Sequence, residues 1–247
     1  MNRPMPPSDQ QPDAAQESAD RFLRSMEAAG VRRVPRGKAA TPAAGSAQEA
    51  GEASPGAAAD VEETLAAVAA EVAGCTACPL HETRNQTVPG EGNTRARIVF
   101  VGEGPGADED RTGRPFVGRA GKLLEDIITK GMKLSRADVY ICNVVKCRPP
   151  GNRVPAPSEL HACHDYLERQ LLAIRPDVIC TLGATATRHL LEDDRPMGRL
   201  RGGTHSFRGI PVIATYHPAY LLRNPAAKAP TWQDIQRVME LAGGSAP

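Results

Sequence analysis

Four short runs of apolar, often β-branched residues restrict the fold of this chain more than any other feature. Each run is nearly continuous in apolar character, which is typical of strands covered on both faces. The runs are Ile98–Val101, Val139–Val145, Val178–Leu182 and Ile210–Thr215. Helical spacing of apolar residues precedes, separates and follows them, at residues 61–73, 122–130, 158–174, 184–191 and 232–241. This alternation predicts a three-layer α/β/α sandwich around a central four-stranded parallel sheet.

The first 60 residues differ from the rest in composition. They hold 15 Ala, 7 Pro, 5 Gly and 5 Ser, and their only aromatic residue is Phe22. So few large apolar side chains cannot offset the entropy that is lost when the backbone is ordered. We therefore expect a disordered Ala/Pro-rich arm over residues 1–60. Residues 61–247 then form one domain, which is long enough to bury a core.

Charge and hydropathy limit the partners of the chain. The 30 Lys and Arg residues against 29 Asp and Glu residues give a formal net charge of +1, so any nucleic-acid binding must use local patches. No apolar run approaches the roughly 18 residues that cross a bilayer. The N-terminal Met-Asn-Arg-Pro-Met-Pro-Pro also lacks the apolar core of a signal peptide. We expect a cytoplasmic protein with no membrane partner.

The carboxyl ends of the predicted strands are where ligands bind in parallel α/β folds. The segment after the first strand, Gly102-Glu103-Gly104-Pro105-Gly106-Ala107, formally matches a dinucleotide fingerprint. However, Pro105 removes a backbone donor, and the acidic run 108–110 puts negative charge where a pyrophosphate would lie. We instead expect the glycines to admit a flat, uncharged ligand, with Glu103 and Glu109 facing the same pocket. Phe116, among glycines and basic residues, is either core packing or a stacking platform for a base.

Six cysteines in a reducing compartment argue for metal ligation or packing before disulfides. Cys75-x-x-Cys78 is a loop chelate, and a second pair, Cys147 and Cys163, lies sixteen positions apart. Prolines soon after Cys147 are typical of iron–sulfur loops, although the spacing leaves zinc as an alternative. The two remaining cysteines lie inside apolar strands and are interpreted as buried small hydrophobic residues; they are Cys142 and Cys180.

Three long motifs, in this order, resemble the family 4 uracil-DNA glycosylases. They are residues 102–110 continued by 113–124, Asn143-Val144-Val145-Lys146-Cys147-Arg148-Pro149-Pro150, and His217-Pro218-Ala219-Tyr220-Leu221-Leu222-Arg223. The resemblance covers residues from about 62 to 242. It implies a monomeric DNA repair enzyme that flips uracil out of single- or double-stranded DNA and hydrolyses its N-glycosidic bond. It also implies a structural [4Fe-4S] cluster on Cys75, Cys78, Cys147 and Cys163.

The same resemblance assigns roles in base recognition. Phe116 would stack on the uracil face. The amide of Asn143 would meet O4 and N3–H together, a pattern that cytosine reverses. His217, helped by the backbone N–H of Gly104, would donate to O2 as negative charge develops on the departing base.

Water activation and DNA contact are assigned to other residues. Glu103 is the first candidate for orienting water or stabilising the sugar cation, and Glu109 is the second. Glu109 would also lie close to the 5-position of the base and so exclude the methyl group of thymine. The apolar wedge and cationic clamp at the DNA would be Leu221, Leu222 and Arg223. Four further arginines are candidate phosphate contacts, with solvated surface as the equal alternative; they are Arg148, Arg153, Arg199 and Arg201.

Three alternatives compete with this prediction. A close relative traps uracil covalently on a histidine in a longer basic insertion, but the loop Pro149–Pro157 is short and has no histidine. Family 5 relatives share the cysteines but lack acids in the first motif, where this chain has Glu103 and Glu109. The non-enzymatic alternative is an iron–sulfur DNA-binding module.

Overall fold

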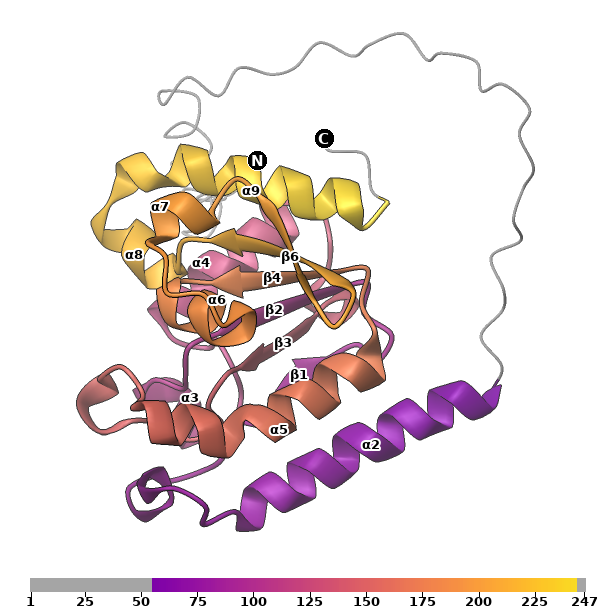
Figure 1. Cartoon of the computed structure of the whole chain (residues 1–247), viewed down its shortest axis with the longest axis vertical. Coiled ribbons are helices and arrows are strands. Elements are labelled where there is room, and N and C mark those ends of the chain that lie inside the picture. The colour runs from indigo at the N-terminus through magenta and orange to yellow at the C-terminus, as the bar shows by residue number, and fades with distance from the viewer. Residues whose placement is uncertain (1–54, 244–247) are drawn as a thin grey trace, which may run out of the picture. The chain divides into compact units, whose positions relative to one another are not determined.

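The computed structural model describes residues 55–243, and the predicted arm up to residue 54 lies outside them, as do residues 244–247 (Figure 1). The first described helix, α2 (Pro55–Gly74), begins before the predicted start at residue 61 and so inside the range assigned to the arm. Within the described range, none of the helices combines the length and apolar character that crossing a lipid bilayer requires.

A six-stranded sheet in the order β1-β3-β2-β4-β6-β5 forms the centre of the domain. The four predicted runs form four of its strands, which pair in parallel. These strands are β2 (Ile98–Gly102), β3 (Tyr140–Asn143), β4 (Val178–Leu182) and β6 (Ile210–Thr215). Every residue of β2, β3 and β4 is buried, as expected of strands covered on both faces.

The predicted four-stranded parallel sheet is corrected by two antiparallel edge strands. The strand β1 (Glu91–Gly92) pairs with β3, and β5 (Thr204–Phe207) pairs with β6. The first is only two residues long and the second is mostly polar and exposed, so neither carries an apolar pattern. A tight turn through Arg208 and Gly209, both with positive φ, joins β5 to β6.

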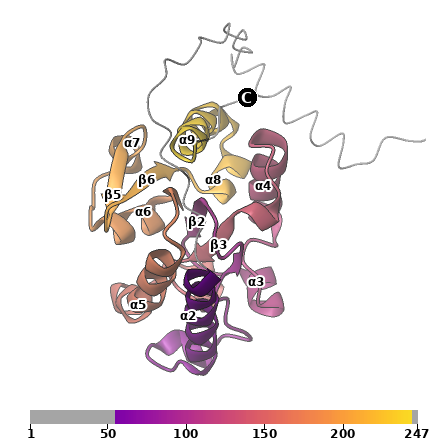
Figure 2. The same cartoon turned by 90° about the vertical axis from the view of Figure 1, so that its right-hand side faces the viewer.

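Helices cover both faces of the sheet (Figures 1 and 2). On one face lie α5 (Pro157–Ile174) and α6 (Ala184–Leu191), whose leucines pack against β2, β3 and β4, while α2 packs on α5. On the other face lie α4 (Arg119–Asp126), which continues into a π-helical turn at Ile127–Gly131, and α9 (Lys228–Leu241). The α/β class is therefore confirmed. Three short helices complete the domain: α3 (Ala107–Thr112), α7 (Met197–Leu200) and α8 (Pro218–Arg223).

Candidate functional site

A pocket of about 590 Å³ opens at the carboxyl ends of β2, β3, β4 and β6. Segments from all four strand ends line it, as the position rule for parallel sheets predicts. The structure brings eight of the predicted site residues together here: Glu103, Gly104, Glu109, Phe116, Asn143, Arg153, His217 and Arg223. The pocket is thus assembled from residues more than one hundred positions apart in the sequence.

Asn143 is the last residue of β3, and its side chain points into the pocket wall with only 1% of its surface exposed. Its Oδ1 is buried and has no hydrogen-bond partner among the described residues. Gly102 makes room for it, because a Cβ at that position would overlap both Oδ1 and the ring of Phe116. A buried amide oxygen without a partner costs free energy, so this atom is suited to a ligand that brings a donor.

Phe116 lies in the loop between α3 and α4, and its ring faces the ring of His217. The two ring centroids are 5.6 Å apart and the planes are tilted by 31°. The backbone of Phe116 has φ of 51°, in the left-handed region that bulky residues avoid. Gly121 of α4 lies so close that a Cβ there would overlap the Phe116 carbonyl.

His217 caps its own helix, and this cap fixes the position of its proton. Its Nδ1 accepts a hydrogen bond of 3.1 Å from the backbone N–H of Ala219 in α8. Burial, together with the nearby Arg223, lowers the pKa of His217 to about 4. The ring is therefore neutral near pH 7, and since Nδ1 is an acceptor, Nε2 carries the proton and is the available donor.

The two candidate glutamates have different surroundings. Glu103 follows β2 directly, is half-buried, and accepts a hydrogen bond from the hydroxyl of Thr185 on its Oε2. Glu109 instead accepts three backbone hydrogen bonds: from Val117 and Gly118 on Oε1 at 2.9 Å each, and from Gly106 on Oε2 at 3.1 Å. Glu109 therefore holds the loop that carries Phe116, a task that the sequence did not reveal.

The predicted DNA contacts divide by exposure. Leu222 is 43% exposed and Arg223 is exposed at the pocket rim, whereas Leu221 is 1% exposed. DNA contact by Leu221 stays a prediction, and the burial of this side chain does not support it. Phosphate contact by Arg201 is likewise not supported, since its side chain is 15% exposed and its guanidinium forms an ion pair of 2.7 Å with buried Asp234.

Sequence reasoning missed the strand end after β4. Gly183, Ala184 and Thr185 line the pocket there, and Thr185 supplies the partner of Glu103. The rule that ligands bind at carboxyl ends of parallel strands applies to this strand as well, so the position rule was the signal that could have found them. Tyr220 and Val154, both exposed, also line the pocket.

A second, smaller pocket gathers four of the six cysteines. It is lined by Cys75, Cys78, Cys147 and Cys163, together with Arg84, Lys146 and Tyr166 among others. Arg84 donates to Cys147 Sγ at 3.2 Å and to the carbonyl of Cys75 at 2.8 Å. Burial raises the pKa of Cys147, and it raises the pKa of Cys163 to about 11.

The remaining two cysteines lie apart from this pocket. Cys142 and Cys180 are fully buried within β3 and β4, as predicted for packing residues, and burial raises the pKa of both thiols. Lys146 lines the cysteine pocket, and its buried Nζ donates to the carbonyl of Asn143, a residue of the first pocket, at 2.8 Å and to Gln170 Oε1 at 2.6 Å.

Comparison with known proteins gives consistent matches. The sequence pattern of the Uracil DNA glycosylase superfamily matches residues 89–236. A type-4 uracil-DNA glycosylase of Thermotoga maritima is 53% identical over 66% of this chain and 85% of its own length. One from Archaeoglobus fulgidus is 44% identical over 75% of this chain and 96% of its own length. A type-5 enzyme of Pyrobaculum aerophilum is 35% identical over 54% of this chain.

Proposed function

This chain belongs to the family 4 uracil-DNA glycosylases and removes uracil from DNA in base excision repair, and we propose that the pocket at the four strand ends performs this reaction. The observation that carries the assignment is the buried Oδ1 of Asn143, which has no hydrogen-bond partner within residues 55–243, beside the rings of Phe116 and His217. A base inside a duplex is out of reach of such a recess, so the nucleotide must be flipped into it.

Uracil is recognised through its edge and its face. Oδ1 of Asn143 accepts from N3–H of the base, and the amide nitrogen donates to O4. Cytosine offers an acceptor and a donor at these places in the reverse order, so binding it would leave buried groups unpaired. Phe116 stacks on the ring, and the fixed carboxylate of Glu109 excludes a methyl group at the 5-position.

Bond cleavage needs stabilisation of the negative charge that develops on the departing base. The Nε2–H of neutral His217 donates to O2, and the backbone N–H of Gly104 helps. A donor already fixed by its own helix cap requires little reorganisation at the moment of reaction. We assign His217 as a catalytic residue in this sense, without proton transfer.

Glu103 is the better of the two candidate acids for the water. One of its oxygens is held by Thr185. The other can orient water or face the sugar cation. Glu109 has both oxygens committed to backbone N–H groups, so we assign it to positioning the Phe116 loop. The DNA itself is contacted by the apolar Leu222 and the cationic Arg223 at the rim.

We also propose a [4Fe-4S] cluster on Cys75, Cys78, Cys147 and Cys163. Four thiols around one pocket are the donor set of such clusters. The resemblance to family 4 enzymes, and not the spacing of the cysteines, favours the cluster over zinc. When bound, the cluster supplies a rigid cross-link between α2, the Cys147 loop and α5, and no redox step is required of it.

The test uses purified protein with oligonucleotides that carry one uracil or, as the control, one thymine. We expect release of free uracil, alkali-labile abasic sites and about four iron atoms per chain. An adduct that survives denaturing electrophoresis would instead identify a covalent trap, and binding without cleavage by iron-loaded protein would identify a DNA-binding module. We also propose that the enzyme acts as a monomer, in the cytoplasm at the nucleoid.

A further inference from the structure

The backbone at Phe116 is strained, because a residue other than glycine adopts a left-handed conformation there. Its φ of 51° is unusual for a residue with a large side chain, and its chain neighbours are Pro115 and Val117. A residue persists in this region only where its surroundings hold it there, and such residues cluster at ligand-binding sites. Contacts around the loop must therefore keep the Phe116 ring in the pocket wall.

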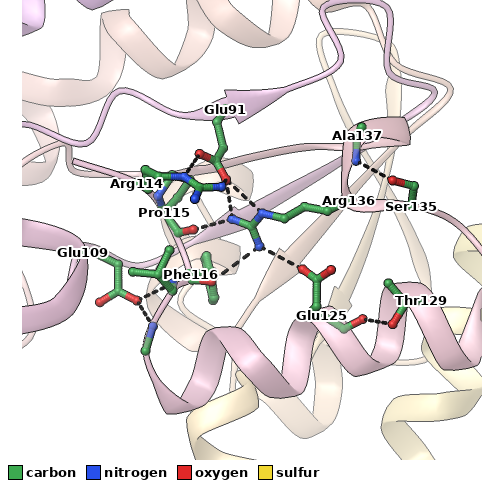
Figure 3. Close-up of polar contacts among 12 residues, drawn as sticks. Glu91, Glu109, Arg114, Pro115, Phe116, Glu125, Thr129, Ser135, Arg136 and Ala137 are labelled. Atoms are coloured by element: carbon green, nitrogen blue, oxygen red, sulfur yellow. Dashed lines mark hydrogen bonds and ion pairs between the residues drawn. The ribbon is translucent and has the colours of Figure 1, made fainter. Parts of the chain in front are cut away.

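Arg136 donates hydrogen bonds to backbone carbonyl groups of the loop that carries Phe116 (Figure 3). It lies in the short 3₁₀ turn Arg136–Asp138 just before β3, twenty residues along the chain from Phe116. One of its guanidinium nitrogens donates to the Pro115 carbonyl and another donates to the Phe116 carbonyl at 3.4 Å. Glu109 holds the two N–H groups that follow Phe116, so the strained residue is fixed from both directions.

Two glutamates hold Arg136 in turn. Its Nε donates to Glu91 of the edge strand β1 at 2.8 Å, and it pairs with Glu125 of α4 at 3.4 Å. Burial would raise the pKa of Glu91, but hydrogen bonds from Arg114 and Arg136 lower it below its ordinary value, so the carboxylate stays charged. The side chain of Arg136 is 18% exposed, whereas that of Arg114 is 60% exposed.

We propose that Arg136, oriented by Glu91, is the positioning residue that holds Phe116 in its base-stacking pose and thereby sets the affinity of the pocket for uracil. The inference rests on the proposed stacking role of Phe116. Both loop contacts of Arg136 are backbone carbonyls flanking the strained residue, and none is a core side chain. A planar guanidinium presents several donors in a fixed fork, so a single side chain can bind two carbonyls and two carboxylates.

The test measures the inhibition constant of free uracil for Arg136→Gln, alongside the affinity for abasic-site DNA, which lacks the base. We expect Arg136→Gln to weaken uracil binding about tenfold while abasic-site DNA binds as before, because only the stacking pose is relaxed. Arg114→Gln is the matched control, since it also removes an ion pair with Glu91 but touches no carbonyl of the loop. It should change uracil binding by less than about twofold.

A double-mutant cycle separates action through Phe116 from general destabilisation. If Arg136 acts through the ring, Arg136→Gln adds less than about twofold to uracil binding once Phe116 is replaced by alanine. Additive effects, or equal effects of Arg136→Gln and Arg114→Gln, would overturn the inference and leave the role of Phe116 intact. Unchanged uracil affinity in Phe116→Ala would overturn both. If thermal melting shows that Arg136→Gln is unfolded, Glu91→Gln takes its place in the same cycle. A loss of uracil affinity of about threefold that disappears in the Phe116→Ala background supports the inference, and unchanged uracil affinity in Glu91→Gln overturns it.

Discussion

Two of the segments that line the pocket are held in place in different ways. The β2 segment, residues 103–118, is held by its own Glu109 and also by side chains from elsewhere in the sequence, Arg136 and Thr185. The β6 segment, residues 216–223, is largely held by its own residues. His217 caps the helix that follows it, and Tyr216 stacks on Tyr220 with ring centroids 5.0 Å apart. The difference suggests that base recognition depends in part on long-range contacts, whereas the leaving-group donor depends mainly on local ones.

Removing the donor of the β6 segment should have the largest effect. We expect His217→Ala to slow single-turnover cleavage of uracil DNA by about 10²–10³-fold, because one hydrogen bond to the developing charge is lost. The dissociation constant for the DNA should change little. His189→Ala, a histidine outside the pocket, is the control for general damage. A wild-type rate in His217→Ala would exclude the proposed role.

The glutamates should respond differently although both lie in the β2 segment. We expect Glu103→Gln to slow the single-turnover rate by about 10²-fold with unchanged affinity for uracil, since only the charge near the water and sugar is lost. Glu109→Gln should chiefly weaken uracil binding, by about tenfold, because it loosens the loop around Phe116. The measurement is the rate and the uracil inhibition constant for each variant. The reverse pattern would exchange the two assignments.

The specificity of the pocket should depend on Asn143. A protonated carboxyl at this position accepts through one oxygen and donates through the other, so it can pair with cytosine as well as with uracil. We expect Asn143→Asp to lower the ratio of uracil to cytosine excision by about 10–100-fold. Asn152→Asp, at an exposed amide of the same pocket, is the control. Equal ratios in the two variants would argue against base reading by Asn143.

The sequence predicted the features of the fold and the site that depend on neighbouring residues, and it missed those that depend on contacts between residues far apart in the chain. The four apolar runs and the carboxyl ends of three of them were identified because buried parallel strands carry their own apolar pattern, whereas the end of β4 was not recognised as part of the site. Glu91 and Arg136 were missed because the hydrogen bond between them depends on the pairing of β1 with β3, and no local sequence pattern predicts this pairing. Leu221 and Leu222 are neighbours on a six-residue helix, too short for helical periodicity to tell which of them faces inward.

The burial of His217 also predicts a pH dependence of stability. The folded pKa of His217 is about 4, against an ordinary value of 6.5. Between these values the unfolded chain takes up a proton that the folded protein does not. We therefore expect the free energy of unfolding to fall by up to roughly 3 kcal/mol as the pH drops from 6.5 to 4. Denaturant melts of wild type and His217→Gln isolate this contribution, and identical slopes against pH would contradict it.

The smallest effect on activity is expected at the end of the β6 segment that is proposed to contact DNA. Leu222→Ala removes an exposed apolar group that can fill the space left by the flipped base, so cleavage in duplex DNA should slow severalfold more than in single strands. Leu221→Ala is the matched comparison, because its buried side chain should cost about 2–5 kcal/mol of stability without changing the duplex to single-strand ratio. Rates on both substrates, with melts for both variants, separate the two leucines. If Leu221→Ala altered the ratio and Leu222→Ala did not, the wedge would lie at the buried position and α8 would have to turn when DNA binds.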